Sequence, residues 1–160
     1  MGGRGASSGG GGGRGGTTIN GTAFEMEDFD GASAYARELA ENMLDSAQYP
    51  DEDEALMVLR RDGVVGAAAF VGESSDGNEL ILQDIAATGR IPGAGTELFV
   101  DVMKRAQSEG KGLYWVAETA SANSYYQKFG FYAYSRRSGG MTHYNVPNRK
   151  LGYYIDRMGR

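Results

Sequence analysis

The order of apolar runs and turn residues constrains the fold of this 160-residue chain more than any other feature. Three apolar runs cover Ala55–Arg60, Val64–Val71 and Glu79–Ala87. The turn signals between them are Asp62-Gly63 and the cluster Ser74–Asn78, and residues of these types favour tight reversals of the chain. Because strands joined by short turns pair antiparallel, we expect a three-stranded meander.

The pattern changes after the third run. The glycine loop Gly89–Gly95 leads into Thr96–Ser108, where apolar residues recur at the spacing of one helix face. The short apolar segment Leu113–Ala117 follows. A strand, a helix and a strand joined in this way form a right-handed crossover with two parallel strands. The sequence therefore predicts an α+β fold with a mixed, mostly antiparallel sheet flanked by helices.

The remaining elements are predicted from periodicity and capping residues. We expect helices over Ala32–Gln48, Ala120–Phe129 and Arg149–Met158, a short strand over Thr22–Met26, and a final strand pair over Phe131–Ser135 and Met141–Val146. The first 16 residues are different, because they hold ten of the 26 glycines and no large apolar side chain after Met1. Such a segment cannot offset the entropy of ordering its backbone, so we expect a disordered tail over residues 1–16 and one domain over residues 17–160.

Composition excludes several kinds of site. The chain has no cysteine and only one histidine, His143, so disulfides, thiol nucleophiles and multi-histidine metal sites are excluded and we expect no metal. No apolar run approaches the roughly 20 residues that span a bilayer, and the arginine-bearing start lacks the apolar segment of a secretory signal. We therefore expect a cytoplasmic protein without a membrane partner.

Charge is divided unevenly along the chain. The net charge of −5 combines −12 over residues 17–135 with +5 over residues 136–160 and +2 in the first 16. An acidic body argues against nucleic acid as a partner of the core, whereas the basic end leaves room for a local anion site. Two Arg-Gly segments in the tail are similar to RNA-binding RGG segments, but two arginines are too few for strong phosphate binding.

The glycine loop is the strongest functional signal. In the segment Arg90–Thr96 (RIPGAGT), Gly93 and Gly95 permit unusual backbone conformations and close approach of a ligand. The free N–H groups at the start of the following helix favour an anion, especially phosphate. The P-loop and dinucleotide motifs do not fit, because the lysine of the first and the third glycine of the second are missing. An Arg-x-x-Gly-x-Gly pattern does fit, and an ordinary glycine turn is the alternative.

A second segment adds to this signal. The stretch Ala122–Phe131 (ANSYYQKFGF) resembles the Ala-x-x-x-Tyr-x-Lys-x-Gly-Phe stretch of the GNAT superfamily of acyl-CoA-dependent N-acyltransferases. The order of elements over Ala55–Val146 also resembles that family, and the short link Ala87-Thr88-Gly89 is similar to its compact members encoded by phages and mobile elements. One departure is Thr119, where family members often have asparagine.

The resemblance implies an activity, a co-substrate and a set of residues. It implies acetyl transfer from acetyl-CoA by direct attack of an amine, either a small molecule or a protein lysine, in a monomer or a homodimer. The pyrophosphate would be held by the main chain of Arg90, Ile91, Gly93, Ala94, Gly95 and Thr96. The strand end Ile85, Ala86 and Ala87 would line the pantetheine arm. Tyr126 would protonate the leaving thiolate, a role that suits a phenol whose usual pKa is about 10.

The general base is less clearly indicated. Asp84 is the candidate because it comes late in the third strand, and the alternative is a strand-edge carboxylate facing solvent. Glu79 and Glu118 are weaker candidates, and we expect His143 to pack in the last strand. Tyr126 has aromatic packing as its alternative. The alternative for the whole chain is a non-catalytic GNAT-like module that contacts protein or nucleic acid.

Overall fold

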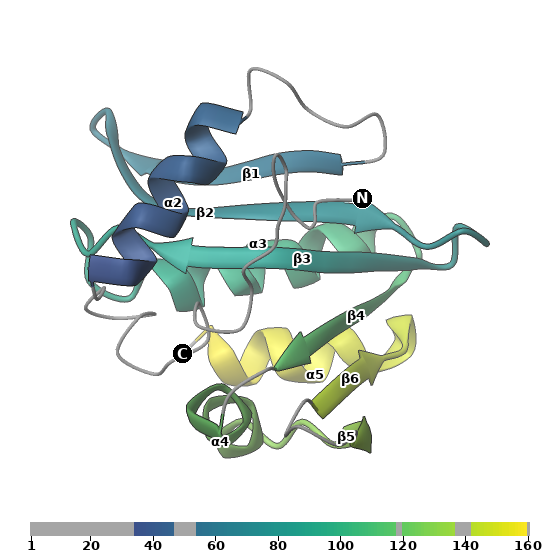
Figure 1. Ribbon diagram of the computed structural model, residues 1–160. Helices are drawn as coiled ribbons and strands as arrows, with labels where there is room; N and C mark the ends of the chain where they lie inside the picture. Colours follow the sequence, from purple (N-terminus) through teal and green to yellow (C-terminus); the bar gives the residue numbers. More distant parts are fainter. Residues whose placement is uncertain (1–33, 47–53, 118–119, 137–141, 160) are drawn as a thin grey trace.

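The computed structural model describes residues 34–46, 54–117, 120–136 and 142–159 (Figure 1). The described strands are β1 (Glu54–Arg61), β2 (Val64–Glu73), β3 (Glu79–Ala87), β4 (Gly112–Ala117), β5 (Ala133–Arg136) and β6 (Thr142–Val146). The described helices are α2 (Ala34–Ser46), α3 (Ala94–Ser108), α4 (Ala120–Lys128) and α5 (Asn148–Met158). The predicted tail, the strand at 22–26 and residues Glu118 and Thr119 lie outside the described residues.

The six strands form one sheet in the order β1-β2-β3-β4-β6-β5. β3 and β4 pair parallel, and the other neighbouring pairs are antiparallel. The first reversal uses Asp62 and Gly63, which have φ of 51° and 80°, as the Asp-Gly signal predicts. The predicted mixed, mostly antiparallel sheet is therefore confirmed, and the α3 crossover accounts for its parallel pair.

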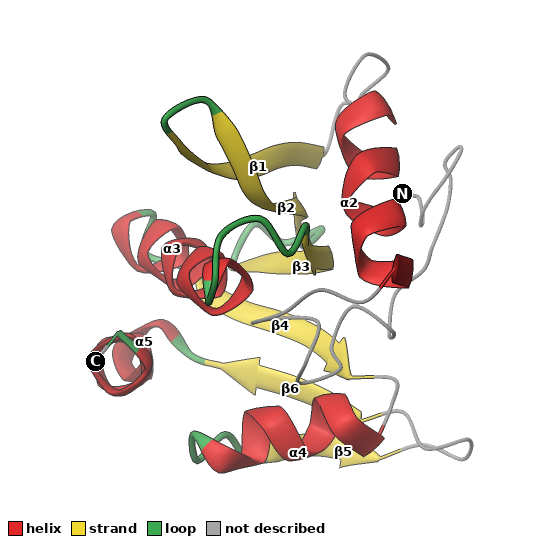
Figure 2. Cartoon of the chain, turned by 90° about the vertical axis from the view of Figure 1, so that its left-hand side faces the viewer, coloured by secondary structure: helices red, strands yellow, loops and turns green. Residues whose placement is uncertain are grey.

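Helices cover both faces of the sheet (Figure 2). α2 packs on β2 and β3 from one side, where Leu39 and Met43 join Phe70 in a small core. α3 and α5 pack together on the other side, over a larger core that includes Phe99 and Trp115. The crossover helix α3 thus buries the apolar stripe that its periodicity predicted.

Several boundaries differ from the predictions by one or two residues, and two of these differences have a clear local reason. α3 begins at Ala94, two residues earlier than expected, because Gly93 adopts the left-handed conformation (φ 72°) and precedes the helix directly. Gly95 therefore lies in the first turn of α3. β5 begins at Ala133 and not at Phe131, because Gly130 has φ of 90° and Phe131 is buried in the core.

Two findings concern membrane crossing and metal binding. Among the described helices, none has the length and apolar character that crossing a bilayer requires. In the same part of the chain, no group of three or more His, Asp or Glu side chains is arranged to hold a metal ion.

Candidate active site

The parallel strands β3 and β4 separate from one another along their length. Their pairing covers Glu79–Ile81 and Gly112–Tyr114, although β3 continues to Ala87 and β4 to Ala117. The β2–β3 register shifts at the same level, so that Gln83 is an extra residue in β3. A bulge of this kind bends the strand that carries it. Figure 1 shows the two strands diverging toward their carboxyl ends, and we call this divergence the opening between β3 and β4.

Thr88 fixes the glycine loop to the sheet where β3 ends. Its buried hydroxyl donates to the carbonyl of Val65 at 2.7 Å and accepts from the N–H of Arg90 at 3.2 Å. The N–H of Thr88 donates to the carbonyl of Gly66 at 2.9 Å. The chain therefore turns out of β3 in one defined direction, which aims the loop at the start of α3.

Gly66 in β2 permits the loop to lie close to the sheet. A Cβ atom at this position would lie 2.8 Å from the Cβ of Ala94 and 2.8 Å from the Cδ1 of Ile91. Contacts of that length are repulsive, so a larger residue would displace the loop or the start of α3. An isolated glycine inside a strand pattern is a signal of close backbone approach, and it was available in the sequence.

The first turn of α3 presents main-chain donors at the end of this loop. The N–H of Ala94 donates to the carbonyl of Ile91 at 3.2 Å, and that of Glu97 begins the helical series by donating to Gly93 at 3.0 Å. The N–H groups of Gly95 and Thr96 lie between them. Because both residues belong to the first turn, the helix itself offers no carbonyl one turn earlier to accept from them. These donors and the helix dipole favour an anion at this point.

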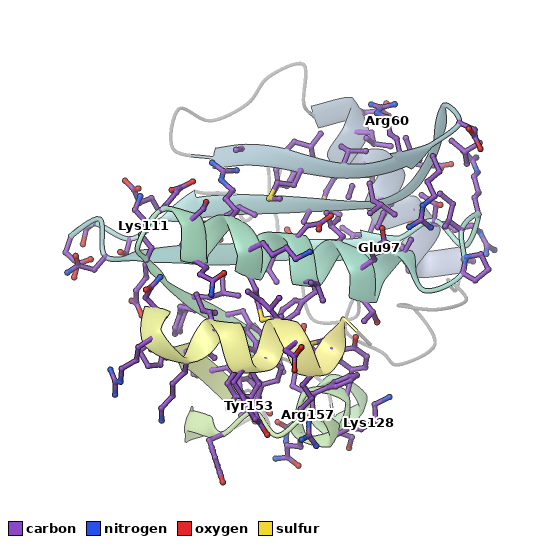
Figure 3. All side chains as sticks on the ribbon, turned by 180° about the vertical axis from the view of Figure 1, so that it is seen from behind. Arg60, Glu97, Lys111, Lys128, Tyr153 and Arg157 are labelled. Atoms are coloured by element: carbon purple, nitrogen blue, oxygen red, sulfur yellow. The ribbon has the colours of Figure 1, made fainter. Side chains whose placement is uncertain are left out.

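A groove runs on from the loop between three helices. Its volume is about 690 Å³, and its lining includes Gly93 and Thr96 at the start of α3, Lys128 and Phe129 at the end of α4, and Arg157 near the end of α5. Figure 3 shows Lys128 and Arg157 at the same end of the molecule. A phosphate-bearing ligand seated on the loop would therefore extend toward these two cations.

The charges along the groove are partly balanced. Glu97 in α3 pairs with Arg61 of β1. Burial raises the pKa of Asp101, an effect that nearby Lys104 opposes and Glu97 reinforces. Lys128 lies over the rings of Tyr125 and Phe129, with its Nζ 5.4 Å and 4.9 Å from their centroids. The carboxylates thus line the α3 side of the groove, and Lys128 and Arg157 line its far end.

Tyr126 lies in the middle of the aromatic core. Its exposed fraction is 0%, and its ring centroid lies 5.1 Å from that of Trp115 and 5.3 Å from that of Phe99. Burial raises the pKa of Tyr126 well above its usual value, and neighbouring Tyr125 and Tyr144 add to the effect. The phenol therefore keeps its proton at neutral pH. The aromatic packing that the sequence left as the alternative is therefore present, and the role of proton donor stays a prediction.

The candidate bases occupy different positions. Asp84 is 2% exposed and pairs in register with Phe70, on the face that α2 covers. The alternative for Asp84 in the sequence analysis was a strand-edge carboxylate facing solvent. That alternative is wrong, because the bulge at Gln83 and helix α2 enclose this position. The carboxylate of Glu79 accepts a hydrogen bond from Asn145, and His143 packs in β6 beside Tyr114.

The predicted residues are brought together only in part. Ile85, Ala86 and Ala87 are buried at the opening. Arg90 to Gly93 form the loop beside it, and Ala94 to Thr96 begin α3. Sequence reasoning missed the two residues that hold the loop, Thr88 and Gly66. It also missed Arg157 as a groove residue, because its place beside the loop depends on how α5 packs on α3.

Comparison with known proteins bears on the fold. No protein-family model matches the sequence, and no curated protein matches it significantly. Solved structures do match. A chain of the AtaT–AtaR complex bound to DNA superposes with a TM-score of 0.58 at 18% identity, over 81% of this chain and 91% of that chain. A Bacillus subtilis acetyltransferase in complex with CoA gives 0.53 at 14% identity, over 68% and 86%.

A third match carries the family's name. A GNAT family acetyltransferase from Elizabethkingia anophelis with acetyl-CoA bound superposes with a TM-score of 0.50 at 17% identity, over 72% of this chain and 85% of that chain. The chain therefore has the GNAT fold, as the resemblance of its two segments implied.

Proposed function

We propose that this protein is an N-acetyltransferase that moves the acetyl group of acetyl-CoA to an amine, on a small molecule or a protein lysine. One observation carries the proposal: the glycine loop and the first turn of α3 lie at the mouth of the opening between β3 and β4. A thioester arm can enter this opening while its phosphates stay on the loop. Similar folds with bound CoA and acetyl-CoA support the choice of ligand.

The three parts of acetyl-CoA have separate places in this proposal. The pyrophosphate accepts hydrogen bonds from the N–H groups of Gly95 and Thr96, with Arg90, Ile91, Gly93 and Ala94 shaping the loop. The pantetheine arm runs along Ile85, Ala86 and Ala87, where β3 has separated from β4. The nucleotide lies in the groove that ends at Lys128 and Arg157. The apolar, buried strand end excludes water around the thioester.

The proposed reaction is a direct attack. The ammonium form of the acceptor gives a proton to Asp84, directly or through water, and the neutral nitrogen attacks the carbonyl carbon of the thioester. A C–N bond forms as the C–S bond breaks. Tyr126 gives its phenolic proton to the sulfur that leaves, and the extra proton on the newly acylated nitrogen returns to the phenolate, through water, so that the amide, free CoA and neutral Tyr126 result. Asp84 then gives the first proton to solvent. A phenol with a raised pKa is suited to this step, because it is fully protonated beforehand and the thiolate it meets is newly formed.

Ligand binding tests the first half of the proposal. A ligand bound only by the native state adds roughly 2.7 kcal/mol at a concentration of 100 Kd, which shifts the melting temperature by several degrees. Acetyl-CoA is therefore expected to raise the melting temperature, while acetyl phosphate at the same concentration leaves it unchanged. The absence of a shift at millimolar acetyl-CoA would count against the proposal.

A second candidate is a non-catalytic module that contacts protein or nucleic acid. The complete burial of Tyr126 favours it, because a phenol packed only for structure would have the same surroundings. A thiol-release assay with a panel of amines separates the two. Release of CoA that depends on the acceptor identifies an enzyme, whereas binding of acetyl-CoA without release identifies the module.

A further inference from the structure

Two tyrosine rings stand exposed near the last helix. Tyr132, between α4 and β5, is 84% exposed, and Tyr153 in α5 is 59% exposed. Within the described part of the chain, only Val64 joins them among the large exposed hydrophobic residues. Both rings line one cavity of about 440 Å³, outside the glycine loop and the opening between β3 and β4. The aromatic exposure is therefore concentrated in one place.

The other side chains of this cavity are basic or support the rings. Its lining consists of Gly130, Tyr132, Lys150, Tyr153, Tyr154 and Arg157, with no carboxylate among them. Lys150, Tyr153 and Arg157 recur at three- and four-residue intervals, which places them along one stripe of α5. We call Tyr132, Lys150, Tyr153 and Arg157 the tyrosine–cation surface.

Contacts with neighbouring side chains hold the tyrosine–cation surface in place. Tyr154 is buried and stacks on Phe131 with centroids 4.1 Å apart, and its ring meets that of Tyr153 edge to face at 5.0 Å. The guanidinium of Arg157 donates to the hydroxyl of Tyr153 at 3.1 Å. A cation and an aromatic face are therefore fixed side by side, which lowers the entropy that a ligand would lose by ordering them.

We propose that the tyrosine–cation surface binds single-stranded nucleic acid. Each nucleotide carries a planar base and a phosphate together, so one repeating unit satisfies both an exposed ring and a neighbouring cation. The cavity has the size of a small-ligand site, in which a base can sit against Tyr153 while its phosphate meets Lys150 or Arg157.

Charge complementarity supports this occupant. The body of the chain carries −12 over residues 17–135, which repels nucleic acid from most of the surface, whereas residues 136–160 carry +5. The basic end predicted a local anion site, and α5 places two of its cations beside the exposed rings. The expectation that nucleic acid does not coat the core is compatible with a single confined site.

Fluorescence anisotropy with a labelled 12-nucleotide oligouridylate tests the proposal on the full chain. We expect binding at 50 mM salt that weakens roughly fivefold at 150 mM, as two phosphate contacts to a single strand require. The double variant Tyr132→Ala with Tyr153→Ala is expected to lose at least tenfold in affinity. Lys150→Gln is expected to flatten the salt dependence by about one contact.

Two matched variants serve as controls. Arg60→Gln removes an exposed cation on β1, at the opposite end of the molecule in Figure 3. Val64→Ala truncates the third large exposed hydrophobic residue of the described chain. Both are expected to bind the oligonucleotide like the wild type, and all variants should keep the wild-type melting temperature. Acetyl-CoA binding, measured in parallel on the tyrosine variant, separates this proposal from that of the active site.

Three outcomes would overturn the inference. The first is the absence of oligouridylate binding at 50 mM salt. The second is equal binding by the wild type and the tyrosine variant, which would place the contact elsewhere, for example in the tail. The third is tighter binding of a glutamate–tyrosine copolymer than of the oligonucleotide, which would assign the surface to an acidic protein.

Discussion

Thr96 in the first turn of α3 and Tyr125 in α4 are joined by a hydrogen bond between their side-chain hydroxyls. Tyr125 is buried, and both residues line the groove that runs from the glycine loop. The helix that begins at the loop is thereby connected to the helix that carries Tyr126. The two segments that resemble the GNAT motifs thus meet at one hydroxyl–hydroxyl contact in the wall of the groove.

A double-mutant cycle tests this contact. Tyr125→Phe and Thr96→Val each remove one hydroxyl with little change of shape, and each is expected to lower the free energy of unfolding by about 1 kcal/mol. The double variant is expected to lose less than the sum, because either single substitution already breaks the bond between the two hydroxyls. Urea unfolding measures the three values, and strict additivity would contradict a direct bond.

Gly66→Ala in β2 is expected to displace the glycine loop that packs against it. Its Cβ would collide with Ala94 and Ile91 at 2.8 Å, so the unfolding free energy should fall by roughly 1–3 kcal/mol. The melting-temperature shift caused by acetyl-CoA should shrink as well. Gly152→Ala in α5 is the matched control, because the nearest atom outside the helix is the flexible end of Gln107 at 3.2 Å. That variant should be neutral or slightly stabilising.

Two substitutions of Thr88 test the role of its hydroxyl separately from that of its side-chain shape. Thr88→Val keeps the branched form but loses the bonds to Val65 and Arg90, and it is expected to cost about 1–3 kcal/mol because buried polar groups lose their partner. Thr88→Ser retains the hydroxyl and should keep most of the wild-type affinity for acetyl-CoA. Isothermal titration compares the two, and equal affinities would show that the hydroxyl does not position the loop.

Tyr126→Phe is expected to affect turnover and alkaline stability together. Loss of a general acid typically lowers turnover 10²–10⁴-fold, while the dissociation constant of acetyl-CoA should stay nearly unchanged. The pKa of Tyr126 is raised by burial, so the native state keeps this proton at a pH where the unfolded chain has lost it. The stability that this provides is complete below about pH 10 and is lost as pH rises further.

The variant should therefore lose less stability between pH 9 and pH 11 than the wild type does. Tyr154, whose pKa is also raised mainly by burial, remains in both proteins and leaves part of the alkaline loss in place. Denaturant unfolding at the two pH values gives the comparison. Turnover equal to that of the wild type would remove Tyr126 from the mechanism without touching its place in the core.

Local patterns were enough to predict most elements. Asp62-Gly63 set the first reversal because both residues reach positive φ, and the apolar stripe of α3 predicted its buried face. The start of α3 was predicted two residues late, because the spacing of apolar residues does not show that Gly93 is the left-handed residue before the helix. Such a boundary depends on one backbone angle.

The sequence by itself determined the meander, the crossover and the glycine loop, because turns, helix periodicity and capping act over a few neighbouring residues. Only the tertiary structure decided how β3 leaves β4 at the level of Gln83, that Asp84 is enclosed, and that Arg157 reaches the groove of Thr96. These features depend on strand register and on packing between α3 and α5. Residues far apart in the sequence set both, so local preference cannot specify them.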